Sequence, residues 1–247
     1  MQYSRADAHG QVILKYFNKE HNFDVVERED GFVNVDEGAK LYFSKYGEWD
    51  KSERQAIRHA HGRCLDIGCG AGRVLLYLQQ KGLDCVGIDY SPLAIKVCKL
   101  RGVKNAKVMG IDDVTSFRKG AFDTIIMYGN NFGLFGNKNK AKRLLKTLHT
   151  ITSDNATIIA EDRDPYITDN PVHFKYHASN VKRGRMPGQL KIRVRFMQYS
   201  TPWYDYLYVS KDEMKELLNG TGWRVSKFIN SEGFRKNGVY VAIIKKM

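Results

Sequence analysis

The chain has 247 residues, of which 43% are hydrophobic, so one large domain with a substantial core is expected. It carries 40 Lys and Arg against 27 Asp and Glu, and the resulting net charge of +13 attracts nucleic acid or anionic small molecules. No apolar run is long enough to span a membrane, and the first residues lack the apolar stretch of a secretion signal. This predicts a soluble, cytoplasmic protein with no membrane partner.

Residues 1–62 are polar, aromatic and interrupted by glycines, and we expect an N-terminal helical or lid region. Ser52 is a suitable N-cap for a helix that leads the chain into the first strand. Four aromatic side chains precede this helix, and they either fold over the functional site or pack against the helix. These residues are Tyr42, Phe43, Tyr46 and Trp49.

Strands and helices then alternate, which is typical of a doubly wound, mostly parallel α/β sheet. Strands are predicted at residues 63–67, 85–88, 107–109, 122–127 and 156–160, and helices at 73–80, 92–102 and 138–151. The four cysteines of this half contain no Cys-x-x-Cys pair, so we expect reduced core residues and no metal site. They are Cys64, Cys69, Cys85 and Cys98.

The pattern changes after Asp162. Residues 165–209 contain four prolines and two strand-like stretches, 191–198 and 203–209, which predicts an inserted β-rich lobe on the substrate side. A helix from 210 to 218 and an antiparallel strand pair at 223–229 and 239–245 follow. The chain is therefore predicted to be a single domain, 1–247, in which 63–164 and 210–247 form a Rossmann-like core.

The most specific pattern begins in the first core strand. Asp66 lies in that strand, and the turn after it has three alternating glycines, Gly68, Gly70 and Gly72. Such a turn lets backbone N–H groups approach a ligand closely. A second strand ends about 20 residues later in Asp89, the usual position of a carboxylate that binds a ribose.

The spacing also distinguishes between ligands. Arg73 stands where a dinucleotide-binding turn has its third glycine. The carboxylate of Asp66 suits an ammonium group better than a pyrophosphate. Together these residues resemble motifs I and II of the class I S-adenosylmethionine-dependent methyltransferases, and the resemblance covers roughly residues 63–247.

The resemblance implies a Rossmann-like sheet with a reversed final strand, S-adenosyl-L-methionine as cofactor, and a set of cofactor contacts. After the first two strands these are Asp66, Gly68, Cys69, Gly70, Arg73, Asp89 and Tyr90. After the third strand, many members have an acidic residue that binds adenine where this chain has Gly110. Ile111, through its backbone, or Asp112 or Asp113 is expected to take over.

The loop after the fourth strand reads Gly129-Asn130-Asn131-Phe132-Gly133, and Gly129 and Asn130 are expected to contact the cofactor unless they form an ordinary turn. The catalytic residue is not identified by the sequence, and the candidates are Asn131, Asp162 and His177. A neutral amine acceptor needs only desolvation and late proton removal, whereas a hydroxyl or acidic carbon needs a base.

We therefore expect a methyltransferase that acts on a small molecule held between the N-terminal region, the 129–133 loop and the 165–209 lobe. Two alternatives remain open. One is a tRNA or rRNA methyltransferase, and the other is a cofactor-binding regulatory protein without transfer activity. The RNA alternative draws on six cations of the lobe: Lys182, Arg183, Arg185, Lys191, Arg193 and Arg195. The oligomeric state is not predicted.

Overall fold

The computed structural model describes residues 5–20, 23–36, 39–232 and 238–247. Residues 1–4, which are part of the segment expected to lack a secretion signal, lie outside the described residues. Among the residues that the structure describes, no helix is long and apolar enough to cross a membrane. The four cysteines are free and buried, which agrees with a role in the core.

The larger of two sheets has seven strands in the order β11-β12-β7-β6-β3-β4-β5. The five strands from β7 to β5 are parallel, whereas β12 runs antiparallel to β7 and β11 antiparallel to β12. Their bounds are β3 Cys64–Ile67, β4 Cys85–Asp89, β5 Ala106–Val108, β6 Phe122–Met127, β7 Thr152–Arg163, β11 Trp223–Asn230 and β12 Val239–Lys246. The predicted α/β class and the reversed final strand are confirmed.

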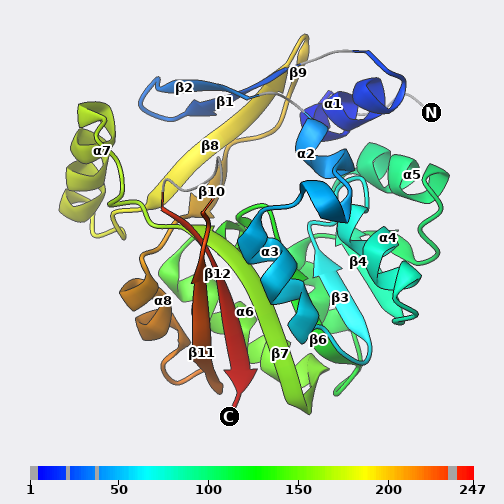
Figure 1. Cartoon of the computed structure of the whole chain (residues 1–247). Helices are drawn as coiled ribbons and strands as arrows, with labels where there is room; N and C mark the ends of the chain where they lie inside the picture. The colour runs from blue at the N-terminus through cyan, green and yellow to red at the C-terminus, as the bar shows by residue number, and fades with distance from the viewer. Residues whose placement is uncertain (1–4, 21–22, 37–38, 233–237) are drawn as a thin grey trace.

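Helices cover both faces of this sheet (Figure 1). One face packs against α3 (Lys51–Ala56), α4 (Arg73–Gln80) and α5 (Pro92–Leu100), and the other against α6 (Lys138–Ile151) and α8 (Lys211–Leu218). Short 3₁₀ turns, η1 (Tyr46–Glu48), η2 (Ile57–His59), η3 (Ile111–Ser116) and η4 (Asn131–Phe135), join these elements. The chain order reverses beside β3, which has β4 on one side and β6 on the other. A ligand site is expected at the carboxyl ends of these strands.

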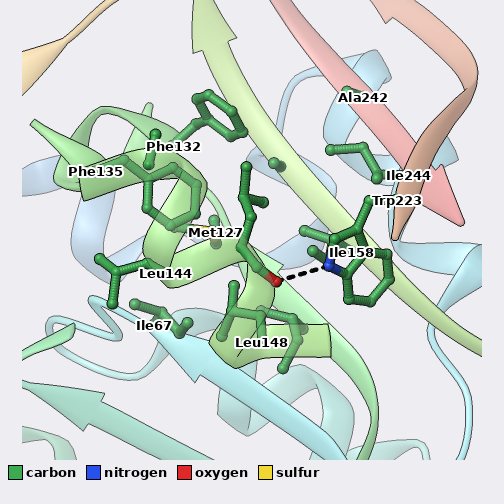
Figure 2. Close-up of a cluster of buried hydrophobic side chains, with 14 of the residues drawn as sticks. Ile67, Met127, Phe132, Phe135, Leu144, Leu148, Ile158, Trp223, Ala242 and Ile244 are labelled. Carbon is green, nitrogen blue, oxygen red and sulfur yellow. Dashed lines mark hydrogen bonds between the residues drawn. The ribbon is translucent and has the colours of Figure 1, made fainter. Parts of the chain in front are cut away.

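The core beneath α6 and α8 is continuous and apolar (Figure 2). Leu144, Leu145 and Leu148 form the buried face of α6, as its helical periodicity predicts. Trp223 of β11 is 1% exposed and donates from its indole Nε1 to the Leu145 carbonyl, at 2.9 Å. This bond satisfies the one polar atom of the indole and fixes α6 against the sheet edge.

The second sheet joins two segments that are far apart in the sequence. Its order is β10-β8-β1-β2, all antiparallel, and β9 pairs with β8. The bounds are β1 Asp24–Arg28, β2 Val33–Asp36, β8 Gln189–Phe196, β9 Tyr199–Ser200 and β10 Tyr204–Leu207. The N-terminal region also contains α1 (Ala8–Phe17) and α2 (Lys40–Phe43), and the lobe contains α7 (Pro171–Lys182). The expectation of a helical N-terminal region therefore missed the hairpin β1–β2, which needs β8 as a partner.

Candidate functional site

The glycine turn lies between β3 and α4 and has a backbone that only glycine adopts easily. Gly68, Gly70 and Gly72 have φ of 74°, 52° and 81°. Space is restricted as well, because a Cβ at Gly68 would lie 2.4 Å from the Asn131 amide nitrogen and one at Gly72 2.6 Å from Cys98 Sγ. Cys69, within the turn, is buried. Four N–H groups of the turn are also used within the protein: those of Gly68 and Cys69 donate to the Ile88 carbonyl, that of Gly72 to the Cys69 carbonyl and that of Gly70 to Asp89. The turn is therefore fixed by both its packing and its hydrogen bonds.

Asp89 ends β4 and connects the turn to the next helix. Its Oδ2 accepts from the Gly70 N–H and its Oδ1 from the Ser91 N–H, each at 2.9 Å. Burial raises the pKa of Asp89 to about 6, against the effect of these two hydrogen bonds, and Asp7 raises it further. The carboxylate therefore both holds the turn and caps the segment before α5. It keeps lone pairs for other donors, because each oxygen has two.

Asp66 lies beneath the turn and is 3% exposed. Burial and, to a smaller extent, Asp89 raise its pKa to about 7, although Arg73 lowers it. Its Oδ2 is buried and has no hydrogen-bond partner within the described residues. Arg73 is paired elsewhere, because its Nη2 donates to Glu53 at 2.5 Å and its guanidinium lies 5.0 Å from the Trp49 ring.

The loop after β6 meets the glycine turn. Asn131 donates from its Nδ2 to the carbonyls of Ile67 and Gly68, at 2.9 and 3.0 Å, so its amide holds the turn in place. Asn130 has a left-handed backbone with φ of 61°, and its N–H donates to Glu161 Oε1 at 3.1 Å. The Oδ1 of Asn130 is buried and has no hydrogen-bond partner within the described residues. A Cβ at Gly129 would meet nothing within 4 Å, so the space beside this glycine is open.

The residues predicted to contact adenine differ in their exposure and in their partners. Tyr90, after β4, is 48% exposed, and its ring meets His9 of α1 edge-on at 6.1 Å. Ile111 begins η3 and is half-buried. Asp112 forms ion pairs with Lys140 at 2.7 Å and Arg143 at 3.2 Å, so its carboxylate joins η3 to α6. Of these predicted contacts, Asp112 is thus engaged by two cations of α6.

The two other catalytic candidates lie on different elements, Asp162 on β7 and His177 on α7. Asp162 of β7 is fully buried, its Oδ1 accepts from the Arg163 N–H at 2.7 Å, and burial raises its pKa well above the usual value. His177 is on α7, which lies at the outer edge of the molecule, away from α4 and the glycine turn (Figure 1). Burial, His173 and Arg28 lower the pKa of His177, and its ring faces Tyr166 at 6.3 Å. The fold does not bring His177 to the turn.

The lobe touches the site through β10, which lies within the predicted strand 203–209, but the sequence did not indicate that its tyrosines reach the site. Tyr206 donates to the Asn130 carbonyl at 2.5 Å, and a Cβ at Gly133 would lie 2.2 Å from its ring. Tyr204 and Tyr206 alternate along β10 and share one face of the strand. The repeated tyrosines at 204, 206 and 208 were the available signal.

Four of the six lobe cations are paired with acidic residues of the N-terminal segment. Arg193 and Arg195 of β8 pair with Glu27 of β1, at 2.9 and 3.3 Å. Arg183 and Arg185 pair with Glu29, at 3.2 and 2.8 Å. The basic face that the sequence predicts on β8 is therefore partly neutralised, and no group of metal-binding side chains is present within the described residues.

A family model described as a methyltransferase domain matches residues 42–227, most of the chain. The chain belongs to this family. The match, with the sheet order and the glycine turn, confirms the resemblance to class I S-adenosylmethionine-dependent methyltransferases.

Solved structures share the fold of this methyltransferase. A methyltransferase from Bacteroides fragilis, in complex with S-adenosyl-L-homocysteine, aligns with a TM-score of 0.81 over 98% of this chain and 95% of that one, at 23% identity. At this identity the likeness shows the fold alone.

Two curated relatives match a shorter stretch. A 2-heptyl-1-hydroxyquinolin-4(1H)-one methyltransferase of Mycobacteroides abscessus is 39% identical over 72 residues, 27% of this chain and 31% of that protein. A ubiquinone biosynthesis O-methyltransferase of Xanthomonas oryzae is 30% identical over 71 residues, 27% of this chain and 30% of that protein. The matched segments thus span less than a third of these relatives.

The site fits the cofactor of this family. S-adenosylmethionine has an ammonium group and a ribose but no phosphate. The buried acceptor oxygens of Asp66 and Asn130 suit the ammonium, since neither has a hydrogen-bond partner within the described part of the chain. The carboxylate of Asp89 suits the ribose hydroxyls at the usual place after the second core strand.

Proposed function

We propose that this chain transfers a methyl group from S-adenosylmethionine to a small-molecule acceptor. The observation that carries the proposal is the contact between the glycine turn and Asp89, beside a loop that β10 of the lobe binds at Asn130. The core would comprise 63–164 and 210–247, and residues 165–209 with the 1–62 region would form the acceptor side.

Each residue would have a defined task toward the cofactor. Asp89 would bind the ribose, Asp66 and Asn130 would bind the ammonium group, and the glycine backbone of the turn would lie along the methionine end. Cys69, Gly129 and Tyr90 would line the pocket, and Arg73 would act through its attraction for Asp66. When bound, the cofactor supplies an electrophilic methyl group on a sulfonium. The chain must align the acceptor with that methyl and exclude water.

The lobe residues would form the acceptor side of the site. Tyr206 joins β10 to the loop that follows β6, so the acceptor would lie against a surface of tyrosines and backbone. A neutral amine would react here after desolvation. Asp162 remains the candidate base for a hydroxyl acceptor, because its Oδ2 is buried and accepts no hydrogen bond within the described residues.

A small acceptor is favoured over RNA by two observations. The lobe cations on which the RNA alternative depends are largely paired with Glu27 and Glu29. The two curated relatives are named for a hydroxyquinolinone and for ubiquinone biosynthesis, which are small molecules. The proposal names a class of acceptor, a small molecule, and does not specify its reacting atom.

The test is a transfer assay with methyl-labelled cofactor and a panel of small aromatic amines, phenols and quinones, with total tRNA and rRNA in parallel. Label in a small product that is lost in the Asp66→Asn variant supports the proposal. Label in RNA alone would establish the RNA alternative. Cofactor binding without turnover on any acceptor or cell extract would favour the regulatory protein.

A further inference from the structure

The N-terminal helix α2 lies directly on the glycine turn. A Cβ built at Gly70 would lie 2.8 Å from Cδ1 of Tyr42, so the tyrosine ring packs against the bare backbone of the turn. Gly70 also donates its N–H to Asp89. The turn is thus contacted on one side by the ribose-binding carboxylate and on another by an aromatic ring from outside the core.

Tyr42 also lies near both neighbouring parts of the site. Burial is the main cause that raises the pKa of Tyr90 and of Tyr206, and Tyr42 is among the groups that raise each further. Tyr90 follows β4, on the expected adenine side, and Tyr206 belongs to β10, on the acceptor side. Tyr42 is therefore within electrostatic reach of both halves of the proposed site.

One side chain connects α2 to the turn. Arg101, the C-cap of α5, donates from the same Nη1 to the Tyr42 carbonyl at 3.1 Å and to the Ala71 carbonyl at 2.6 Å. Its guanidinium also lies over the Phe43 ring, 4.6 Å from the centroid. Burial lowers the pKa of Arg101, but an arginine stays charged at any working pH. Both hydrogen bonds are therefore charge-assisted.

We propose that Tyr42 forms one wall of the cofactor pocket and that Arg101 is the positioning residue that keeps this wall closed over the glycine turn. The inference rests on the proposed function, since it needs the cofactor to lie along the turn. With Arg101 in place, Tyr42 would cover the methionine end of the bound cofactor. Without it, α2 would lose its connection to Ala71 and the pocket would open on that side.

The kinetics of S-adenosylhomocysteine release test this proposal. Dissociation of radiolabelled S-adenosylhomocysteine from the full chain is followed by rapid filtration after excess unlabelled ligand is added. We expect the Arg101→Gln variant to release the ligand at least tenfold faster than wild type. Arg101→Lys should lie between the two, because lysine donates hydrogen bonds but lacks the planar group that stacks on Phe43. Melting temperatures are measured for every variant.

A second variant separates the wall from the connection. Tyr42→Ala removes the ring but keeps the backbone carbonyl that Arg101 binds, so fast release in this variant supports the wall directly. If Arg101→Gln does not fold, the release rate of Tyr42→Ala still tests whether Tyr42 forms a wall of the pocket. The matched control is Arg143→Gln, an exposed arginine of α6 that pairs with Asp112, and its release rate should equal that of wild type.

The results that overturn the inference differ from those that overturn the function. If wild type binds S-adenosylhomocysteine and both Arg101→Gln and Tyr42→Ala release it at the wild-type rate, the inference fails alone. A lowered melting temperature with unchanged release would likewise show a structural role only. If wild type binds no S-adenosylhomocysteine, the proposed function fails and the inference falls with it.

Discussion

Asp89 is the residue on which most of the site depends. Its two oxygens accept from Gly70 and Ser91, and its free lone pairs are available for a ribose. We expect Asp89→Ala to weaken S-adenosylhomocysteine binding by at least tenfold, since a hydrogen bond to a charged group contributes about 1.5–3 kcal/mol. Calorimetry measures the loss. Asp212→Ala, which removes an exposed carboxylate of α8 that pairs with Lys215 at 2.8 Å, is the control and should bind normally.

Asp66 gives the site a pH dependence. Its pKa of about 7 in the free protein means that it is largely protonated at pH 6 and ionised at pH 8. A cofactor ammonium pairs with the ionised form, so affinity should rise as pH rises through 7 and binding should release a proton. Titrations between pH 6.5 and 8 measure this change. In Asp66→Asn the affinity should be lower at pH 8 and nearly independent of pH.

The same shift has the opposite sign for the stability of the free protein. Because the pKa of Asp66 in the folded protein lies above the ordinary aspartate value of 3.8, its contribution to stability is present at acid pH and is lost as pH rises through about 7. Asp66→Asn should therefore melt higher than wild type at pH 8 when no cofactor is present. If Asp66→Asn instead melts lower than wild type at pH 8, the buried carboxylate stabilises the fold.

At the residue scale, the sequence predicted the positions of the turn but not its partners. The alternating glycines and Asp89 carry the motif in a single continuous stretch, so they can be recognised without a structure. The contacts of Asn131 with Ile67 and Gly68, and of Arg101 with Ala71, join residues about 30 or more positions apart. Such contacts follow from the packing of β6 and α5 beside β3, which local patterns do not specify.

At the scale of elements, β10 depends on a glycine of η4. Gly133 is buried, and a Cβ there would lie 2.2 Å from the Tyr206 ring. We expect Gly133→Ala to cost about 1–3 kcal/mol, as overpacking of a core typically does. Denaturant unfolding measures the cost. Adding Tyr206→Ala should recover part of it, whereas strict additivity would show that the two residues do not touch. Gly47→Ala, with open space around it, is the control.

The cations of β8 distinguish the two enzyme readings. Arg193 and Arg195 already pair with Glu27, and Lys191 lies opposite Asp205 in the strand register. We expect the triple variant Lys191→Gln, Arg193→Gln, Arg195→Gln to leave tRNA binding and its salt dependence unchanged. If these residues contacted phosphates, each lost contact would lower the salt slope by about 0.7. A flatter salt dependence in the variant would therefore favour RNA as substrate.

The core elements were predictable because each buries its own periodic face. The helices at 73–80 and 138–151 and the strand at 122–127 have the predicted bounds. The hairpin β1–β2 was missed because its pattern is short and its pairing with β8 joins Glu27 to Arg193. Tertiary context decides such strands more than intrinsic preference does.

At the scale of the whole molecule, the smaller sheet links the N-terminal segment to the lobe, and η4 links the lobe to the core. β1 pairs with β8 over Val25 to Arg28, and Tyr206 binds the Asn130 carbonyl. The two sheets should therefore unfold together, in one transition that calorimetry and fluorescence report at the same temperature. If the lobe unfolds in a separate transition at a lower temperature, these contacts are too weak to couple its unfolding to that of the core.

A bound cofactor should stabilise this whole unit. A ligand at one hundred times its dissociation constant adds about 2.7 kcal/mol to the free energy of unfolding. For a chain of this size each kcal/mol raises the melting temperature by about 2–4 °C, so S-adenosylhomocysteine should raise it by about 5–11 °C. Asp89→Ala should lose most of this shift at the same ligand concentration. Because α2 contacts the turn through Tyr42, Arg101→Gln should show a reduced shift as well. An equal shift in wild type and Asp89→Ala would place the ligand away from the glycine turn.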